Sequence, residues 1–171
     1  MPELSLDKTP QEHYATLDPM GFSGRIGRLR LLAWSMVLSA IFVAASLLAL
    51  LITKISPTLG IACSATLATA YLIISLRINA QRLHDLNWSA WMLLLHLVPM
   101  ANLALTLMML LMPGTPGPNK YGPPPPPNSR SVDVLARITI FLIGLSIFIT
   151  VAVFALGLLN ALTNTVNSNS L

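Results

Sequence analysis

The chain has 171 residues, of which 54% are hydrophobic and 9% are charged, and its formal net charge is +4. Soluble domains carry charge on about a quarter of their residues, so this composition excludes an ordinary soluble domain. The positive balance comes without a lysine-rich helix or interleaved aromatic residues, which argues against a nucleic-acid partner and favours anionic lipid head groups.

Long apolar stretches dominate the sequence. Four of them lack any Asp, Glu, Lys or Arg: 31–53, 55–76, 86–112 and 138–171. An apolar run of roughly 18 or more residues is typical of a membrane helix, because such a helix crosses the hydrocarbon core of a bilayer. The sequence therefore predicts an all-α, polytopic membrane protein, built as a small bundle of four apolar helices.

The chain begins with a polar segment that contains three prolines, so residues 1–20 are predicted to be a disordered tail. A Gly- and Arg-rich lead-in follows, in which Arg25 and Arg28 are one helical turn apart. It opens the first predicted helix, about 31–53. We interpret the two arginines as a positive-inside anchor; the alternative is a site for a specific anionic ligand.

The second predicted helix, about 55–85, follows a very short link and should pair with the first as an antiparallel hairpin. Its early turns are rich in small residues, among them Ala62, Thr66 and Ala70. Small residues let neighbouring helix backbones approach closely. We therefore expect this helix to be the central one. The single cysteine, Cys63, excludes an internal disulfide.

A polar segment closes the second helix and contains Arg77, Arg82, His84 and Asp85. A charge near the bilayer boundary is costly unless it is paired or reaches water. Asp85 should therefore be ionised and bonded to Arg82, or to one of the two lead-in arginines, and this bond should fix the helix packing. The alternative is an acid/base pair of His84 and Asp85. Adjacent helical residues point about 100° apart, which disfavours such a dyad.

The third predicted helix, about 88–112, contains Pro99 near its middle. Because proline breaks the helical hydrogen-bond pattern, we expect either one kinked span or a re-entrant hairpin. His96, beside this break, is expected to bond to a neighbouring helix. The alternative is a midplane site around His96, Pro99 and Asn102 in a small transporter or channel.

Three tryptophans, Trp34, Trp88 and Trp91, lie at the ends of apolar runs. Indole side chains favour the level of the lipid head groups. We expect these three residues to act as interfacial anchors.

The remaining predicted segments complete the chain. The membrane domain covers 21–122, and a Pro/Gly-rich loop covers 113–133, with the five prolines 123–127 as an extended spacer. The fourth membrane helix is predicted at 134–162, and an uncharged polar tail at 163–171.

Three separated motifs form an ordered set. They are Phe22-x-Gly24-Arg25-x-x-Arg28, then Arg82-Leu83-His84-Asp85 with Ser89-Ala90-Trp91, then Pro113-Gly114-Thr115 with Asn119-Lys120-Tyr121-Gly122-Pro123. In this order and spacing they resemble the bacterial inner-membrane family catalogued as domain of unknown function eight-hundred-and-five, over about residues 20–125. The resemblance implies a small multi-helix protein of the bacterial inner (plasma) membrane, without an established activity. The chain departs from the family pattern at Gln81, where arginine is usual, and at Ala90, where glycine is usual.

The distribution of cations predicts the orientation in the membrane. If residues 88–112 are re-entrant, eight cations face one side and Lys54 alone faces the other; if all four helices cross, the bias is five to four. The positive-inside rule favours the first arrangement, whereas the length of the segment favours the second. We predict a cytoplasmic N-terminus, with the polar segment at the cytoplasmic face, and leave the side of the C-terminus open.

The predicted function follows from where the polar residues lie. They gather at helix ends, in a cluster made up of Arg25, Arg28, Arg77, Arg82, His84 and Asp85. We expect this cluster to fix helix packing and to contact anionic lipid, a protein partner or a second copy of the chain. The sequence has no Gly-rich phosphate loop, no metal-spaced Cys/His set and no nucleophile motif, so we expect no enzyme, cofactor or metal.

Overall fold

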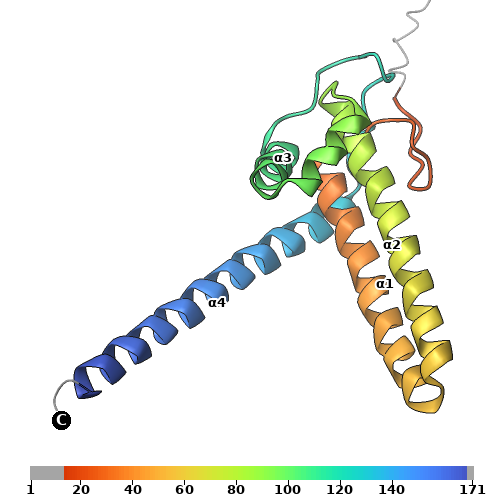
Figure 1. The fold of residues 1–171 in the computed structure, drawn as a ribbon. Helices are drawn as coiled ribbons and strands as arrows, with labels where there is room; N and C mark the ends of the chain where they lie inside the picture. Colours follow the sequence, from red (N-terminus) through yellow and green to blue (C-terminus); the bar gives the residue numbers. More distant parts are fainter. Residues whose placement is uncertain (1–13, 169–171) are drawn as a thin grey trace, which may run out of the picture.

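The computed structural model describes residues 14–168, and most of these are helical (Figure 1). The elements in chain order are α1 (Arg28–Ile55), α2 (Pro57–Asp85), the 3₁₀ helix η1 (Ala90–Leu97), α3 (Pro99–Leu111) and α4 (Arg130–Ser168). The part of the chain described has no β-strand, only an isolated bridge between Asn119 and Gly122. The predicted all-α class is confirmed.

Helices α1 and α2 form the predicted antiparallel hairpin (Figure 1). Ser56 is the only residue between them, and its side chain accepts a hydrogen bond from the Leu59 N–H, while Pro57 occupies the first turn of α2. Gly60 lies against Thr53, where a Cβ would come within 2.7 Å of the Thr53 Cα. The hairpin is therefore tight because a serine cap, a proline and a glycine meet at its turn.

The central helix is α1, not α2 as predicted. Helix α1 packs against α2, α3 and α4, whereas α2 packs against α1 and η1. The small residues Ala62, Thr66 and Ala70 of α2 are exposed, and the Thr66 hydroxyl bonds to the Ala62 carbonyl one turn earlier. Small side chains permit a close helix contact but do not decide which helix uses it.

The third predicted helix is two short elements rather than one span. Pro99 begins α3 instead of interrupting a continuous helix, and α3 has 13 residues. At 1.5 Å per residue it extends about 20 Å, less than the roughly 30 Å of a hydrocarbon core. Three of the described helices are long and apolar enough to cross a membrane: Arg28–Ile55, Pro57–Asp85 and Arg130–Asn164.

Helix α4 does not close a four-helix bundle. It touches α1 near its own beginning, where the Thr139 hydroxyl lies 3.5 Å from the Leu32 carbonyl oxygen, and then diverges from the hairpin (Figure 1). Most of its large apolar side chains are exposed, as expected for a surface that faces lipid. The helix also continues to Ser168, through part of the predicted polar tail.

The segments predicted as tail and spacer are packed against each other. Residues 14–20 of the predicted tail are described, and the Ala15 N–H donates to the Pro124 carbonyl at 2.8 Å; residues 1–13 lie outside the described range. Arg30 donates to the carbonyls of Pro126 and Pro127 at 3.2 and 3.1 Å. The proline run is thus held onto the first turn of α1.

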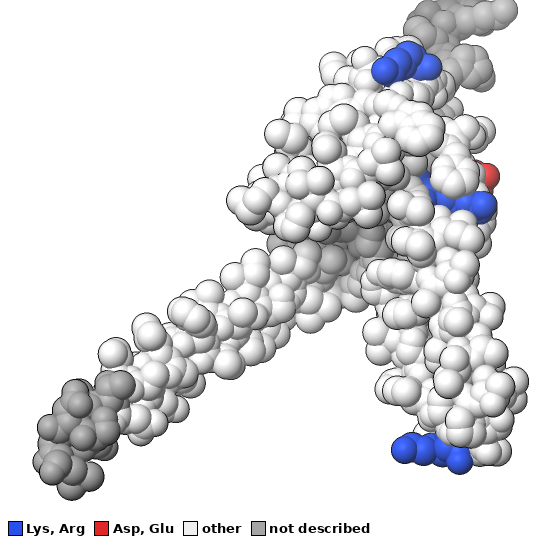
Figure 2. Space-filling view, in the orientation of Figure 1, with Lys and Arg blue, Asp and Glu red and all other residues white. Residues whose placement is uncertain are grey.

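The core lies at one end of the hairpin, where the chain segments converge. Its buried members are Ile26, Leu31, Ile78, Leu83, Leu86, Leu105 and Met109. Figure 2 shows Lys and Arg side chains at this end and at the tip of the hairpin, with a long uncharged surface on the visible face of α4. We call the polar end, formed by residues 14–30, 77–89 and 112–130, the polar head.

Candidate functional site

The centre of the polar head is a buried junction of one carboxylate and two guanidinium groups. Asp85 is the last residue of α2 and is 2% exposed. Its Oδ2 accepts from Arg82 Nη1 at 2.6 Å, and its Oδ1 accepts from Arg25 Nη2 at 3.0 Å. Arg82 is one helical turn earlier on the same helix, whereas Arg25 comes from the segment that leads into α1. Asp85 is therefore bonded both to Arg82 and to one of the two lead-in arginines, Arg25, so the two predicted alternatives occur together.

Arg82 also holds the end of α3. Its Nε donates to the Met109 carbonyl at 2.7 Å and its Nη2 to the Met112 carbonyl at 2.6 Å. The last carbonyls of a helix have no partner within that helix, so a cation there supplies both hydrogen bonds and favourable charge. Arg82 thus joins the end of α2 to the end of α3.

Arg25 holds the loop that follows α3. Its guanidinium donates to the carbonyls of Thr115 at 2.6 Å, Gly117 at 2.7 Å and Gly122 at 3.1 Å. With the Asp85 bond, its N–H groups are engaged, and the side chain is fully buried. One arginine therefore fixes a loop 90 residues further along the chain.

The same loop satisfies the end of α2. The Thr115 N–H and hydroxyl both donate to the Asp85 carbonyl, at 2.9 and 3.0 Å, and Asn119 Nδ2 donates to the His84 carbonyl at 2.8 Å. Gly114 packs directly on the Asp85 carboxylate, where an added Cβ would overlap the carboxylate atoms. The Pro-Gly-Thr motif is thus a cap for α2, and its glycine makes room for the junction.

Gln81 was not predicted as a site residue, yet it anchors the segment before α1. Its Nε2 donates to the carbonyls of Asp18 at 2.6 Å and Gly21 at 2.7 Å, and it is 1% exposed. Its own carbonyl faces the Ile26 N–H at 3.4 Å. Gln81 stands where the family pattern usually has arginine. Both side chains carry N–H donors, so this position could have been recognised from the sequence as one that donates to backbone carbonyls.

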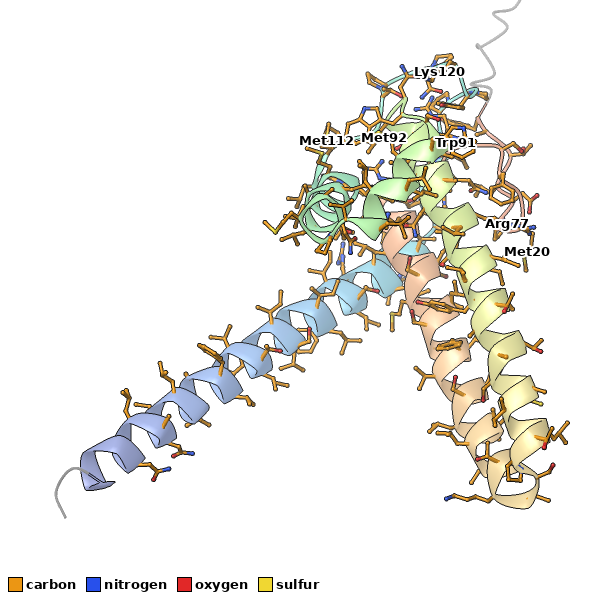
Figure 3. All side chains as sticks on the ribbon, in the orientation of Figure 1. Met20, Arg77, Trp91, Met92, Met112 and Lys120 are labelled. Carbon is orange, nitrogen blue, oxygen red and sulfur yellow. The ribbon has the colours of Figure 1, made fainter. Side chains whose placement is uncertain are left out.

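Arg28 and Arg77, the other two arginines of the predicted cluster, have no ion pair with Asp85. Arg28 is exposed and donates to the Leu111 carbonyl at 3.3 Å. Arg77 donates to the Met20 carbonyl at 2.7 Å and lies 5.0 Å from the centroid of the Phe22 ring, on the flank of α2 (Figure 3). Eight residues separate Arg77 from Asp85, about 12 Å along a helix.

His84 has a different environment from Asp85. Its ring stacks on Tyr121 with centroids 3.9 Å apart and planes 13° apart. Its Nδ1 is buried and has no hydrogen-bond partner among the described residues. Because the two adjacent side chains have separate partners, the geometry offers no orienting bond for an acid/base dyad.

The three predicted interfacial anchors differ in position. Trp34 and Trp88 are partly buried and pack against the core. Trp91 is 78% exposed and lies at the polar head (Figure 3). Trp34 and Trp88 therefore pack against the buried core of the protein, and only Trp91 projects from its surface.

A recess lies beside the junction at the beginning of α1. It has a volume of about 440 Å³, and Arg28, Thr115 and Asn128 are among its lining residues. Helix α1 begins with no side-chain cap and no acidic residue in its first turn. The N-terminal end of α1 and Arg28 bring positive charge to this recess, and the Asp85 carboxylate, which is paired with Arg25 and Arg82, also lines it. No group of three or more His, Cys, Asp or Glu side chains suited to a metal occurs within 14–168.

His96 lies in the second polar region of the molecule. Its Nδ1 is 3.2 Å from the carbonyl of Leu93 in its own helix, rather than bonded to a neighbouring helix as predicted. His96 and Thr106 both line a cavity of about 200 Å³ below the polar head. Asn102 accepts a hydrogen bond from Thr106 at 3.3 Å, and Pro99 is exposed at the start of α3.

These features define a class: an α-helical, polytopic membrane protein whose spans are joined at one end by a buried charge junction. The chain belongs to the family described as Protein of unknown function (DUF805), whose model matches residues 19–123. All of the residues of the junction fall within this match, and α4 follows it.

Two curated relatives match a shorter region. The inner membrane protein YhaH of Escherichia coli strain K12 and that of Escherichia coli O157:H7 are each 40% identical over 48 residues. The aligned region covers 28% of this chain and 40% of each relative. No solved structure matches the chain.

Proposed function

We propose that this protein is a non-enzymatic component of the bacterial inner membrane, whose polar head faces the cytoplasm and contacts anionic lipid head groups. The Arg25–Asp85–Arg82 junction supports this function by fixing the helix packing, while the exposed cations of the head make the lipid contacts. The observation that carries the proposal is that every guanidinium nitrogen of Arg25 and of Arg82 already has a hydrogen-bond partner.

The junction is suited to a structural role. Both guanidinium groups are fully buried and donate to Asp85 and to backbone carbonyls. A lipid phosphate or a substrate would have to displace these bonds to reach them. Removal of one partner from a buried ion pair costs about 3–5 kcal/mol, since it leaves an uncompensated charge.

The exposed cations are suited to lipid contact. Arg28, Lys120, Arg130 and Arg137 are exposed and lie in the head or in the first two turns of α4. Each Lys or Arg near an anionic surface contributes about 1 kcal/mol of attraction. In the recess, Arg28 and the N-terminal end of α1 offer a place for a phosphate group.

The arrangement of spans supports a cytoplasmic head. Helix α1 begins, α2 ends and α4 begins at the head. With three crossings, eight of the nine cations between residues 25 and 137 therefore share one side, and Lys54 lies on the other. The positive-inside rule assigns the richer side to the cytoplasm. The C-terminus would then lie on the periplasmic side.

The test is retention of lipid by the purified protein, measured by native mass spectrometry from micelles containing cardiolipin and phosphatidylcholine. We expect the native chain to retain cardiolipin preferentially. The double variant Arg28→Ala with Arg130→Ala should lose at least half of this preference, because two exposed cations of the head are removed. Lys54→Ala, at the opposite end, is the matched control and should keep it. Equal retention of both lipids by all three proteins would exclude the lipid contact.

A further inference from the structure

The cavity below the polar head gathers polar side chains from every helix. Its polar lining residues are Ser35 of α1, Asn79 of α2, His96 of η1, Thr106 of α3 and Thr139 of α4. The rest of the lining is apolar, and the volume is about 200 Å³. We call this cavity the polar pocket. Polar side chains inside apolar spans are costly, so their convergence on one cavity indicates a binding site.

Several of these polar groups have no hydrogen-bond partner within residues 14–168. Ser35 and Asn79 have no side-chain hydrogen bond among the described residues. His96 uses only Nδ1, and the Leu93 carbonyl opposite it can only accept, so a neutral imidazole presents Nε2 as an acceptor. The pocket therefore offers both donors and acceptors to a ligand.

A second cavity continues from the polar pocket. It is a groove of about 610 Å³ between α1 and α4, and it shares Ser35 and Thr139 with the pocket. Its remaining lining is predominantly apolar, with Val43, Leu47 and Leu142 among its members. The residues that line this apolar groove come from α1 and α4. Figure 1 shows that these two helices diverge from each other. A polar pocket that opens into an apolar groove matches a molecule with a polar head and an apolar tail.

Charge and size limit the class of ligand. No Lys, Arg, Asp or Glu lines either cavity, so a phosphate or carboxylate head group would lack a counter-charge. A cavity of about 150 Å³ is enough to hold a benzene ring. The polar pocket is therefore of the right size for one six-membered ring with small substituents.

We propose that the polar pocket and the apolar groove bind a reduced isoprenoid quinone, with the hydroxylated ring in the pocket and the tail in the groove. The ring hydroxyls donate to His96 Nε2 and exchange hydrogen bonds with the Asn79 amide and the Ser35 hydroxyl. The site is separate from the lipid contacts of the polar head and does not depend on them.

The binding test uses the full chain in neutral detergent, dialysed to equilibrium against a decyl-substituted benzoquinol. We expect Asn79→Leu and His96→Phe each to weaken binding about tenfold, because each removes a hydrogen-bonding group from an apolar surrounding. Thr66→Val, a polar residue of α2 outside both cavities, is the matched control and should bind normally. Equal affinity in all four proteins would overturn the proposal.

A second arm distinguishes the quinol from another uncharged amphiphile and does not require the variants to fold. Dioctanoylglycerol should fail to displace the quinol at equal concentration, and displacement would overturn the choice of ligand. A quinol with a photoreactive group on its tail should label native protein between residues 35 and 47 of α1 and near Thr139 of α4. Labelling concentrated on α2 would place the tail outside the groove and overturn the proposed site.

Discussion

Asp85 and Arg25 are 60 residues apart in the chain, and their side chains meet at 3.0 Å with almost no exposure to solvent. This one contact joins the end of α2 to the segment before α1. Since Arg25 also donates to the loop after α3, the Asp85 carboxylate orients a side chain on which three chain segments depend. The organisation of the polar head can therefore be tested by changing single atoms around this carboxylate.

Replacing the carboxylate by an amide should destabilise the protein strongly. Asp85→Asn leaves Arg25 and Arg82 buried beside each other without a counter-charge, and we expect a loss of about 3–5 kcal/mol in the free energy of unfolding. Thermal unfolding in detergent, followed by circular dichroism, measures this loss. Asp133→Asn is the matched control, because Asp133 lies in the first turn of α4 and its side chain has no hydrogen bond or ion pair among the described residues. This variant should lose less than about 1 kcal/mol in the free energy of unfolding, the usual contribution of an acidic residue at a helix N-terminus. Similar losses for both variants would contradict the role assigned to the junction.

The close approach of Gly114 to Asp85 makes a second prediction. Gly114→Ala would force a methyl group into the carboxylate, so the loop must shift and its hydrogen bonds to Arg25 and to the end of α2 must weaken. We expect a cost of about 1–3 kcal/mol, as for overpacking in a core. Limited proteolysis should show faster cleavage within 113–129.

Gly144→Ala provides the comparison for the glycine substitution. Gly144 lies in α4 with nothing within 4 Å of an added Cβ. Alanine in a helix is about 1 kcal/mol better than glycine, so this variant should keep the native cleavage rate. If the Gly114 variant also cleaved at the native rate, the loop would not depend on the close packing.

Gln81 should act through its N–H donors. Gln81→Glu keeps the size of the side chain but gives carboxylate oxygens where two carbonyls now accept, so it should release the segment of residues 18–26. Leaving buried groups without partners costs about 1–3 kcal/mol each. Gln81→Arg, in contrast, keeps N–H donors at this position and should retain most of the protection of this segment. Hydrogen exchange of the backbone amides in this segment is the measurement, and equal protection in both variants would argue against the donor role.

The sequence was most informative about local relationships. The Asp85–Arg82 pair was predictable because residues three apart on a helix share a face, and the hairpin followed from two apolar runs with a very short link. The choice of Arg25 over Arg28 was not predictable. Both arginines lie in the same lead-in, and only the fold decides that Arg25 turns inward while Arg28 starts α1 at the surface.

Two further features depended on information that periodicity does not contain. Pro99 could either kink one helix or begin another, and the structure uses it in the first turn of α3, where proline loses no hydrogen bond. The composition predicts only a Pro/Gly-rich loop over 113–133, whereas in the structure three carbonyls of this loop are the acceptors for Arg25. Backbone acceptors have no signature in side-chain patterns, so the partners of the junction stayed hidden.

The number of membrane crossings predicts on which side of the membrane each exposed lysine lies. With α1, α2 and α4 as the three spans, Lys54 at the hairpin tip and Lys120 in the polar head lie on opposite sides of the membrane. In a Cys63→Ser background, Lys54→Cys should react with a membrane-impermeant thiol reagent added to the periplasmic side of intact cells. Lys120→Cys should react only after the membrane is permeabilised. Both positions are exposed, so a lack of reaction cannot come from burial. The reverse pattern would place the head outside, against the eight-to-one distribution of the cations between residues 25 and 137. Reaction of both positions in intact cells would rule out α2 as the single crossing between them.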